Sequence, residues 1–211
     1  MRSERIDEQV AEPGQSLGEG EVTPARQAAT VILLRGGERT LELLLVKRTE
    51  SARFMAGVWV FPGGALEQHD GADGHHAAAV RELCEEAAIV LPDSGALVEF
   101  SRWITPEQVT VRFDTRFYLA ELPDGQEPRV DGQECVDLAW LSPAAALAAH
   151  ERGEIALVFP TIKHLEQLSG FATVAELLHH ARGRRVVPVQ PRVVLEGEVA
   201  RVVLPGEPGY E

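Results

Sequence analysis

The hydrophobic positions of the chain form short apolar runs, typical of strands, and several longer segments with a helical period. Residues 27–48 contain two β-rich runs on either side of Gly36 and Gly37, a pattern that predicts a β-hairpin. Further apolar runs predict strands at 57–61, 97–104, 111–121 and 135–141. A terminal hairpin is expected within 192–210.

The expected helices have recognisable starts and stops. The first spans about 73–90 and is followed by a proline. Three more begin with Ser or Thr and end at Gly, at 142–153, 161–170 and 173–183. In the first of these, Ser142 is the expected N-cap and Pro143 the first helical residue. Because strands and helices are mixed without a regular β-α-β alternation, the sequence favours an α+β sandwich over a doubly wound sheet.

Length and composition indicate one globular domain of 211 residues, 45% of them hydrophobic. Residues 1–26 are polar and rich in Gly and Pro, so we expect a mobile tail, with the domain proper at 27–211. A formal net charge of -13 argues against bulk nucleic acid or an acidic membrane as partners. No apolar run approaches the roughly 20 residues of a membrane span. With only two cysteines and no signal-like leader, a cytoplasmic location is expected, and a homodimer is left open.

The helix expected at 73–90 has two distinct faces. Val80, Leu83, Ala87 and Val90 form one apolar stripe that should pack on the sheet. The acids lie off this stripe, which leaves them available for another role or for solvent.

Those acids form a cluster of like charge. Glu82 and Glu86 are i and i+4 neighbours, and Glu85 lies between them with Arg81 one turn before it. Like charges at this spacing destabilise a helix unless a cation lies between them, and Mg²⁺ prefers carboxylate oxygens. The alternative for an isolated string of this kind is a solvated helix face.

The residues that flank the helix favour the metal site over the solvated helix face. Together with a Pro-Gly-Gly turn before the helix, the pattern resembles the Nudix box of the Nudix hydrolases, and it comprises Gly64, Asp70, Arg81, Glu82, Leu83, Glu85, Glu86 and Ile89. Three departures stand out: Asp70 replaces the usual Glu, ten residues separate it from Arg81 so that the box is lengthened, and Ala88 replaces the usual Gly. We expect the lengthened loop, 70–76, to be mobile.

The branch of the family is suggested by more distant segments. The lengthened box, the stretch "WITPEQVTVRFDTRFYLAELP" at 103–123 and "WLSPAAAL" at 140–147 are similar to the branch that includes peroxisomal coenzyme A diphosphatases. The resemblance implies an α/β/α sandwich with a mixed sheet, here extended by C-terminal helices and a hairpin. It also implies a hydrolase that needs Mg²⁺ or Mn²⁺ and cleaves the diphosphate of a nucleoside diphosphate linked to another group, X, with coenzyme A or an acyl derivative as one candidate.

The resemblance also implies roles for single residues. Glu82 and Glu86 would bind the metal, Glu85 would complete the cluster, and the Gly63 carbonyl would add a ligand from the turn. Arg81 would orient Glu85. The general base is not fixed by the box, and Glu82 and Glu134 are both candidates.

Two arginines and a histidine-rich loop are further candidate sites, each with a structural alternative. Arg112 and Arg116 are evenly spaced and so should share one strand face, where they could bind phosphates or form ion pairs with Asp114. The histidines of 68–77 indicate a hydrated loop rather than a zinc site. The rivals to a hydrolase are a Nudix-like ligand-binding or regulatory domain without activity and a protein-interaction module.

Overall fold

The computed structural model describes residues 18, 21–37, 40–196 and 199–210. Its strands are β1 (Arg26–Arg35), β2 (Glu42–Arg48), β3 (Trp59–Val60), β4 (Gly63–Ala65), β5 (Val98–Ile104), β6 (Phe113–Glu121), β7 (Cys135–Leu141), β8 (Pro188–Val189), β9 (Arg192–Glu196) and β10 (Val199–Val203). Its α-helices are α2 (Gly74–Ala87), α3 (Pro143–Glu151), α4 (Phe159–Leu168) and α5 (Val174–Arg182), and short 3-10 helices span Gln68–Asp73 and Ser94–Ala96.

One mixed sheet organises the fold. Its main path runs β3-β2-β1-β6-β5-β8, while β4 pairs with β1 and β7 with β2. The pairs β1·β6 and β5·β8 are parallel, whereas β1·β2 is the expected antiparallel hairpin. The terminal hairpin of β9 and β10 forms a separate two-stranded sheet, as expected.

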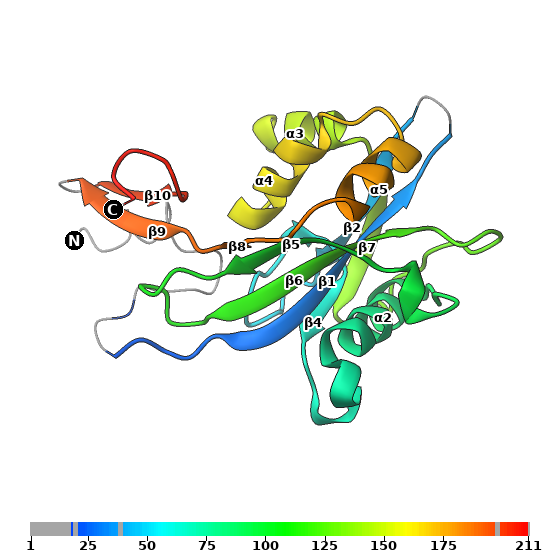
Figure 1. Ribbon diagram of the computed structural model, residues 1–211, viewed down its shortest axis with the longest axis horizontal. Helices are drawn as coiled ribbons and strands as arrows, with labels where there is room; N and C mark the ends of the chain where they lie inside the picture. Colours follow the sequence, from blue (N-terminus) through cyan, green and yellow to red (C-terminus); the bar gives the residue numbers. More distant parts are fainter. Residues whose placement is uncertain (1–17, 19–20, 38–39, 197–198, 211) are drawn as a thin grey trace.

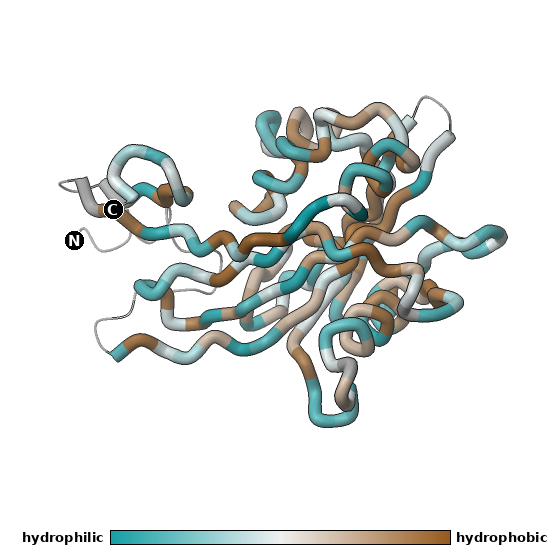
Figure 2. Tube along the Cα trace, in the orientation of Figure 1, coloured by the Kyte–Doolittle hydropathy of each residue, from teal (hydrophilic) through white to brown (hydrophobic). Residues whose placement is uncertain are grey.

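Helices cover both faces of the sheet, with α2 on one side and α3, α4 and α5 on the other (Figure 1). The alternation along β1 explains this arrangement, because successive strand residues point to opposite faces. Val31 and Leu33 pack in the cluster that contains α2, whereas Ile32 and Leu34 pack in the cluster that contains the C-terminal helices. The hydrophobic segments accordingly run along the central strands (Figure 2). The expected α+β fold, an α/β/α sandwich with C-terminal helices and a hairpin, is confirmed.

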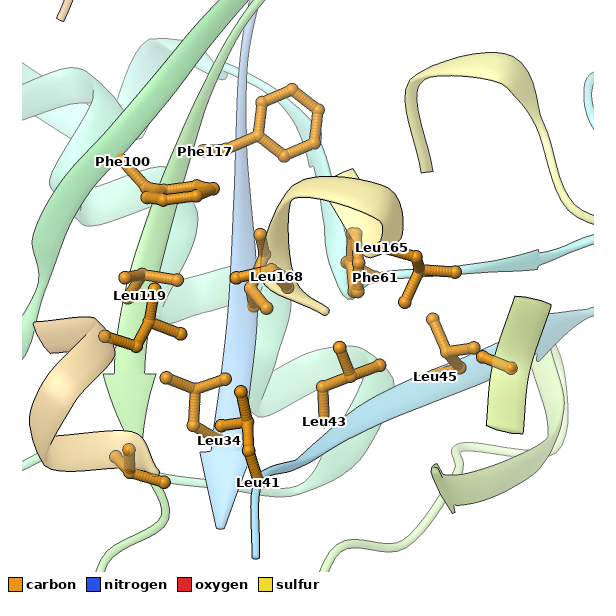
Figure 3. Close-up of a cluster of buried hydrophobic side chains, with 14 of the residues drawn as sticks. Leu34, Leu41, Leu43, Leu45, Phe61, Phe100, Phe117, Leu119, Leu165 and Leu168 are labelled. Atoms are coloured by element: carbon orange, nitrogen blue, oxygen red, sulfur yellow. The ribbon is translucent and has the colours of Figure 1, made fainter. Parts of the chain in front are cut away.

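The core beneath the C-terminal helices joins residues that are far apart in the sequence. Leucines of β1 and β2 meet Leu165 and Leu168 of α4 and the rings of Phe100 and Phe117 (Figure 3). This packing fixes α4 against the strands β5 and β6.

A buried histidine lies in that core. His164 is 1% exposed and lies close to the rings of Phe61, Phe100, Trp103 and Phe117. The Pro160 carbonyl can only accept, so it takes the Nδ1–H of His164 at 2.7 Å, which leaves Nε2 to accept from the Ser101 hydroxyl at 2.5 Å. Burial lowers the pKa of His164 to about 4, so the imidazole is neutral near pH 7.

The C-terminal helices largely follow their sequence signals. Ser142 accepts a hydrogen bond from Ala145 N at the start of α3, and Thr173 caps α5 in the same way. The expected start of α4 at Thr161 is wrong, because the helix begins at Phe159 after a Val158 N-cap that makes no side-chain bond. Here the packing of Leu165 and Leu168 in the core stabilises the helix, and no capping side chain marks its start.

Helix α2 is shorter than expected and ends at Ala87. Ala88 adopts a left-handed conformation with φ 56°, and its N–H donates to the Cys84 carbonyl, which closes the helix. Val90 therefore lies outside the helix and is 57% exposed, so its expected place on the apolar stripe is wrong. Leu83 and Ala87 are fully buried against the sheet, as the stripe predicted.

The segment 70–76, expected to be a mobile loop, lies in helical structure with a kink at Gly71. It comprises the end of the first 3-10 helix and the first turn of α2. Asp70 is buried, accepts from Glu67 N at 2.7 Å and pairs with Arg81. These bonds hold the extra residues of the box in a compact turn, and the helix still enters near residue 73, as expected.

Most of the expected N-terminal tail lies outside the described residues. Of the described part, Arg26 already belongs to β1, and the Thr23 carbonyl accepts from Arg112 Nη1 at 2.6 Å. None of the described helices is long and apolar enough to cross a membrane.

Candidate active site

A cavity of about 620 Å³ opens where helix α2 meets the end of the sheet. Its polar end is lined by Gly63, Glu82, Glu85, Glu86 and Glu134, so the structure brings these predicted site residues together. The cavity then extends along β5 and β6 towards the C-terminal segment.

Glu86 is the most buried acid of this group. Its Oε2 accepts from Gly63 N at 2.9 Å, and its Oε1 lies 3.6 Å from Arg48 Nη1. Burial raises the pKa of Glu86 to about 7, although the hydrogen bond from Gly63 N and the charge of Arg48 lower it. The protein alone therefore supplies too little positive charge to keep this carboxylate fully ionised.

Glu82 lies directly against the glycine turn. A Cβ placed on Gly64 would come within 2.3 Å of Glu82 Oε1, so only glycine lets the backbone approach the carboxylate this closely. Burial raises the pKa of Glu82 as well, against the lowering effect of Arg81. Gly64 thus makes room for Glu82 at the polar end of the cavity.

Arg81 holds the carboxylates in place. Its Nη1 donates to Glu82 Oε1 at 2.7 Å and to Glu85 Oε2 at 3.0 Å. On the other side its Nε and Nη2 donate to Asp70, and Nη2 also reaches the Ala65 carbonyl. The expected contact of Arg81 with Glu85 is present, and Asp70 is the anchor that fixes the guanidinium.

Glu134 approaches from the loop before β7. Asp131 accepts from the backbone N–H groups of Glu134 and Cys135, and the Glu134 carbonyl accepts from Thr49 N. This loop is therefore tied to the end of β2 and holds the Glu134 side chain at the cavity, where it is exposed.

The structure does not bring Arg112 and Arg116 to the cavity. Arg112 precedes β6 and is buried, with its guanidinium bonded to the Thr105 and Thr23 carbonyls. Arg116 lies 3.6 Å from Glu99 on the strand face opposite Thr115 and Phe117, which line the cavity. The expectation that both arginines share a free strand face is wrong, because the strand starts one residue too late for Arg112.

Arg48 is a cavity residue that the sequence did not single out. It ends β2, and its buried Nε has no hydrogen-bond partner in the described part of the chain. A charged residue at the end of an otherwise apolar run was the available signal. Its position beside Glu86 makes Arg48 the better candidate for contact with an anionic ligand.

The donor set of the polar end suits a hard divalent cation. Four carboxylates and a glycine turn offer oxygen ligands, which Mg²⁺ and Mn²⁺ prefer. Among the described residues, no group of three or more His, Cys, Asp or Glu side chains is already gathered closely enough to hold a metal. Arg81 occupies one oxygen of Glu82 and one of Glu85, which leaves the other oxygen of each for a cation.

The anchoring role of Asp70 can be tested by its removal. Asp70→Ala is expected to lower the free energy of unfolding by about 2 kcal/mol, because Arg81 loses a buried charged partner. Urea unfolding measures this effect. Asp70→Asn retains an acceptor for Glu67 N and should lose less stability. Equal stability of Asp70→Ala and wild type would show that the ion pair of Asp70 with Arg81 does not stabilise the fold.

Comparisons with known proteins agree with this geometry. The model of the NUDIX domain matches residues 24–160, more than half of the chain. Putative nudix hydrolase 7 of Caenorhabditis elegans is 30% identical, and the match covers 71% of this chain and 63% of that protein. Acyl-coenzyme A diphosphatase NUDT19 of Homo sapiens is 32% identical, with 56% of this chain and 33% of that protein covered. The chain thus spans less than two thirds of the length of either relative.

A solved structure supports the same assignment. The NUDIX hydrolase from Alicyclobacillus acidocaldarius superposes with a TM-score of 0.68 at 26% identity and covers 74% of this chain and 96% of its own. The family match includes the segment that carries the glutamates and the glycine turn. The chain therefore belongs to the Nudix hydrolase family.

Proposed function

We propose that this chain is a divalent-metal-dependent hydrolase that cleaves the diphosphate of a nucleoside diphosphate linked to a group X, with coenzyme A or an acyl derivative as substrate. The observation that carries the proposal is the position of buried Glu86 and partly buried Glu82 together in the lining of a cavity large enough for a nucleotide-sized ligand. Nudix hydrolases generally need divalent metal ions and act on small-molecule diphosphates.

The carboxylates of the polar end would hold the metal. Glu82 and Glu86 are the main ligands in this proposal, and Glu85 and the Gly63 carbonyl are the supporting ones. When bound, Mg²⁺ or Mn²⁺ would neutralise the diphosphate and stabilise the charge that develops on its oxygens.

The chain's own residues would position the reactants. Arg81 fixes Glu82 and Glu85, and Arg48 faces the same cavity with an unused donor. In the reaction, the oxygen of a water bonds to one phosphorus, and the bridging oxygen leaves with the other phosphate. The proton of that water passes to a carboxylate, for which Glu82 and Glu134 are the candidates.

The choice of coenzyme A rests on similarity and on the shape of the cavity. Human, chicken and frog relatives carry the name acyl-coenzyme A diphosphatase. The cavity continues well past the acids, so a long substituent on the diphosphate fits the available volume. Cleavage would release an adenosine bisphosphate and a phosphopantetheine.

A substrate panel with and without Mg²⁺ tests this proposal. The kcat/KM for coenzyme A is expected to exceed those for ADP-ribose and NADH by at least about tenfold, which needs only about 1.4 kcal/mol of differential transition-state binding. Products resolved by mass would identify the bond that breaks. Equal or lower efficiency on coenzyme A would reject that substrate and leave the hydrolase assignment standing.

An inactive ligand-binding or regulatory domain is the second candidate. It is favoured by the ion pairs of Arg81 with Glu82 and Glu85, since they offset part of the negative charge that a metal would otherwise neutralise. Tight binding of a diphosphate without turnover at any Mg²⁺ or Mn²⁺ concentration would support this alternative. Metal-dependent release of products would exclude it.

A further inference from the structure

One part of the cavity lining consists of aromatic and aliphatic side chains. We call it the apolar arm, and define it by Phe54, Met55, Trp103, Phe159, Pro191 and Val202. The arm and the polar end belong to one continuous cavity, so a single ligand can occupy both.

The rings of the arm are not arranged as a slot for a base. Trp103 and Phe159 meet edge to face at 72°, with their centroids 6.2 Å apart. Phe54 lies at 45° to Phe113, which also lines the cavity, with a centroid separation of 5.7 Å. A planar base stacks best against a parallel ring face, whereas a flexible aliphatic chain fits between tilted rings by simple burial.

The outer wall of the arm comes from the C-terminal segment. Trp103 and Val189 are paired residues of β5 and β8, so β8 brings Pro191 to the rim of the cavity. On β10, Val202 lines the arm while its neighbour Val203 is buried, as the alternation of a strand requires. Pro191 and Val202 both lie outside the segment 24–160 that matches the Nudix domain.

We propose that the apolar arm binds an aliphatic acyl chain carried by the substrate, and that Pro191 and Val202 set the preference for acylated over free coenzyme A. This inference rests on the proposed function for the position of the diphosphate. With the diphosphate at Glu82 and Glu86, the nucleoside and X extend in different directions, and the tilted rings of the arm select the apolar group. The acids carry the reaction, and the C-terminal segment selects the substituent.

The test compares two substrates that differ only in the acyl group. Steady-state kinetics with coenzyme A and octanoyl-coenzyme A would be measured for wild type, Val202→Asp and Val187→Asp. Val187 is 68% exposed, lies in the same C-terminal part and does not line the cavity, so it is a matched control. Val202→Asp is expected to lower kcat/KM for octanoyl-coenzyme A at least about tenfold relative to coenzyme A, because an ionised carboxylate would enter the arm.

Each outcome bears on the proposal. An unchanged ratio of the two kcat/KM values in Val202→Asp would overturn it, as would an equal fall for both substrates, which would place the shared nucleotide in the arm. If Val202→Asp does not fold, Val202→Ala should shift the ratio in the same direction by less, and an unshifted ratio in that variant would also overturn the proposal.

A binding measurement separates this inference from the hydrolase assignment. Calorimetric titration with EDTA present, so that no turnover occurs, is expected to show tighter binding of octanoyl-coenzyme A than of coenzyme A to wild type, and loss of that difference in Val202→Asp. If the protein shows this difference in affinity but hydrolyses neither compound, the result supports the apolar arm and refutes the proposed reaction. If it hydrolyses both compounds and binds them equally well, the result supports the reaction and refutes the apolar arm.

Discussion

Glu86→Gln is expected to lower turnover at least about a hundredfold, because a metal ligand in such a site contributes several kcal/mol to the transition state. The same variant should be more stable than wild type when no divalent metal is present. The pKa of Glu86 is raised to about 7, so the folded protein resists ionising this carboxyl at higher pH. A neutral amide can still accept from Gly63 N, and the free energy of unfolding at pH 8 should rise by about 1 to 3 kcal/mol.

Activity assays with Mg²⁺ and urea unfolding with EDTA measure the two effects separately. Glu82→Gln should show a similar loss of turnover with the fold retained, because Glu82 also lies off the buried stripe. Glu151→Gln, an exposed acid at the end of α3, is the matched control and should change neither quantity. Wild-type turnover in Glu82→Gln or Glu86→Gln would refute the metal assignment.

The second prediction concerns the buried His164 and the stability of the metal-free protein. In a Glu86→Gln background, the free energy of unfolding should fall by up to about 3 kcal/mol as the pH is lowered from 7 towards 4. The folded pKa of His164 is about 4, below the ordinary value of 6.5, so the unfolded chain takes up a proton that the folded protein excludes. His75, whose pKa is also lowered by burial, acts in the same direction.

His164→Gln in the same background should flatten this profile, because Gln can accept from Ser101 and donate to Pro160 without titrating. Urea unfolding at several pH values between 4 and 7 provides the measurement. A slope that persists unchanged in the double variant would show that another group causes it. Below pH 4 the carboxyls with lowered pKa values, Asp70 among them, add their own loss of stability.

In the wild type the two buried groups oppose each other. Glu86 has a raised pKa, so its contribution to stability is present at low pH and is lost as the pH rises towards 7. His164 has a lowered pKa, and its contribution is lost as the pH falls over the same window. The wild-type profile between pH 4.5 and 6.5 should therefore be flatter than that of either single variant.

The sequence predicted most of the fold because its signals are local. The first hairpin, the strand at Cys135–Leu141 and the helix capped by Ser142 each depend on a short pattern of apolar positions, turns and caps. The Nudix box likewise predicted the gathering of Glu82, Glu85 and Glu86, since these residues share one helix.

The features that the sequence did not predict depend on contacts between distant segments or on rare backbone conformations. Alanine has no preference for left-handed φ, so the residue type at position 88 did not indicate the end of the helix, although the Nudix box usually has Gly there. Asp70 appeared to lie in a mobile loop because its partner, Arg81, is eleven residues away. The apolar arm joins Phe54, Trp103 and Val202, which only tertiary packing brings together.

The early end of α2 has an electrostatic consequence for the polar end of the cavity. The unpaired carbonyls of a helix C-terminus carry about half a negative charge, and this field is strongest in the last turn. Because the helix ends at Ala87, Glu85 and Glu86 lie within that turn, and it contains no basic residue to offset them. The backbone dipole thus adds to the charge of the side chains, so a cation bound there would also serve as the C-terminal counter-ion of the helix.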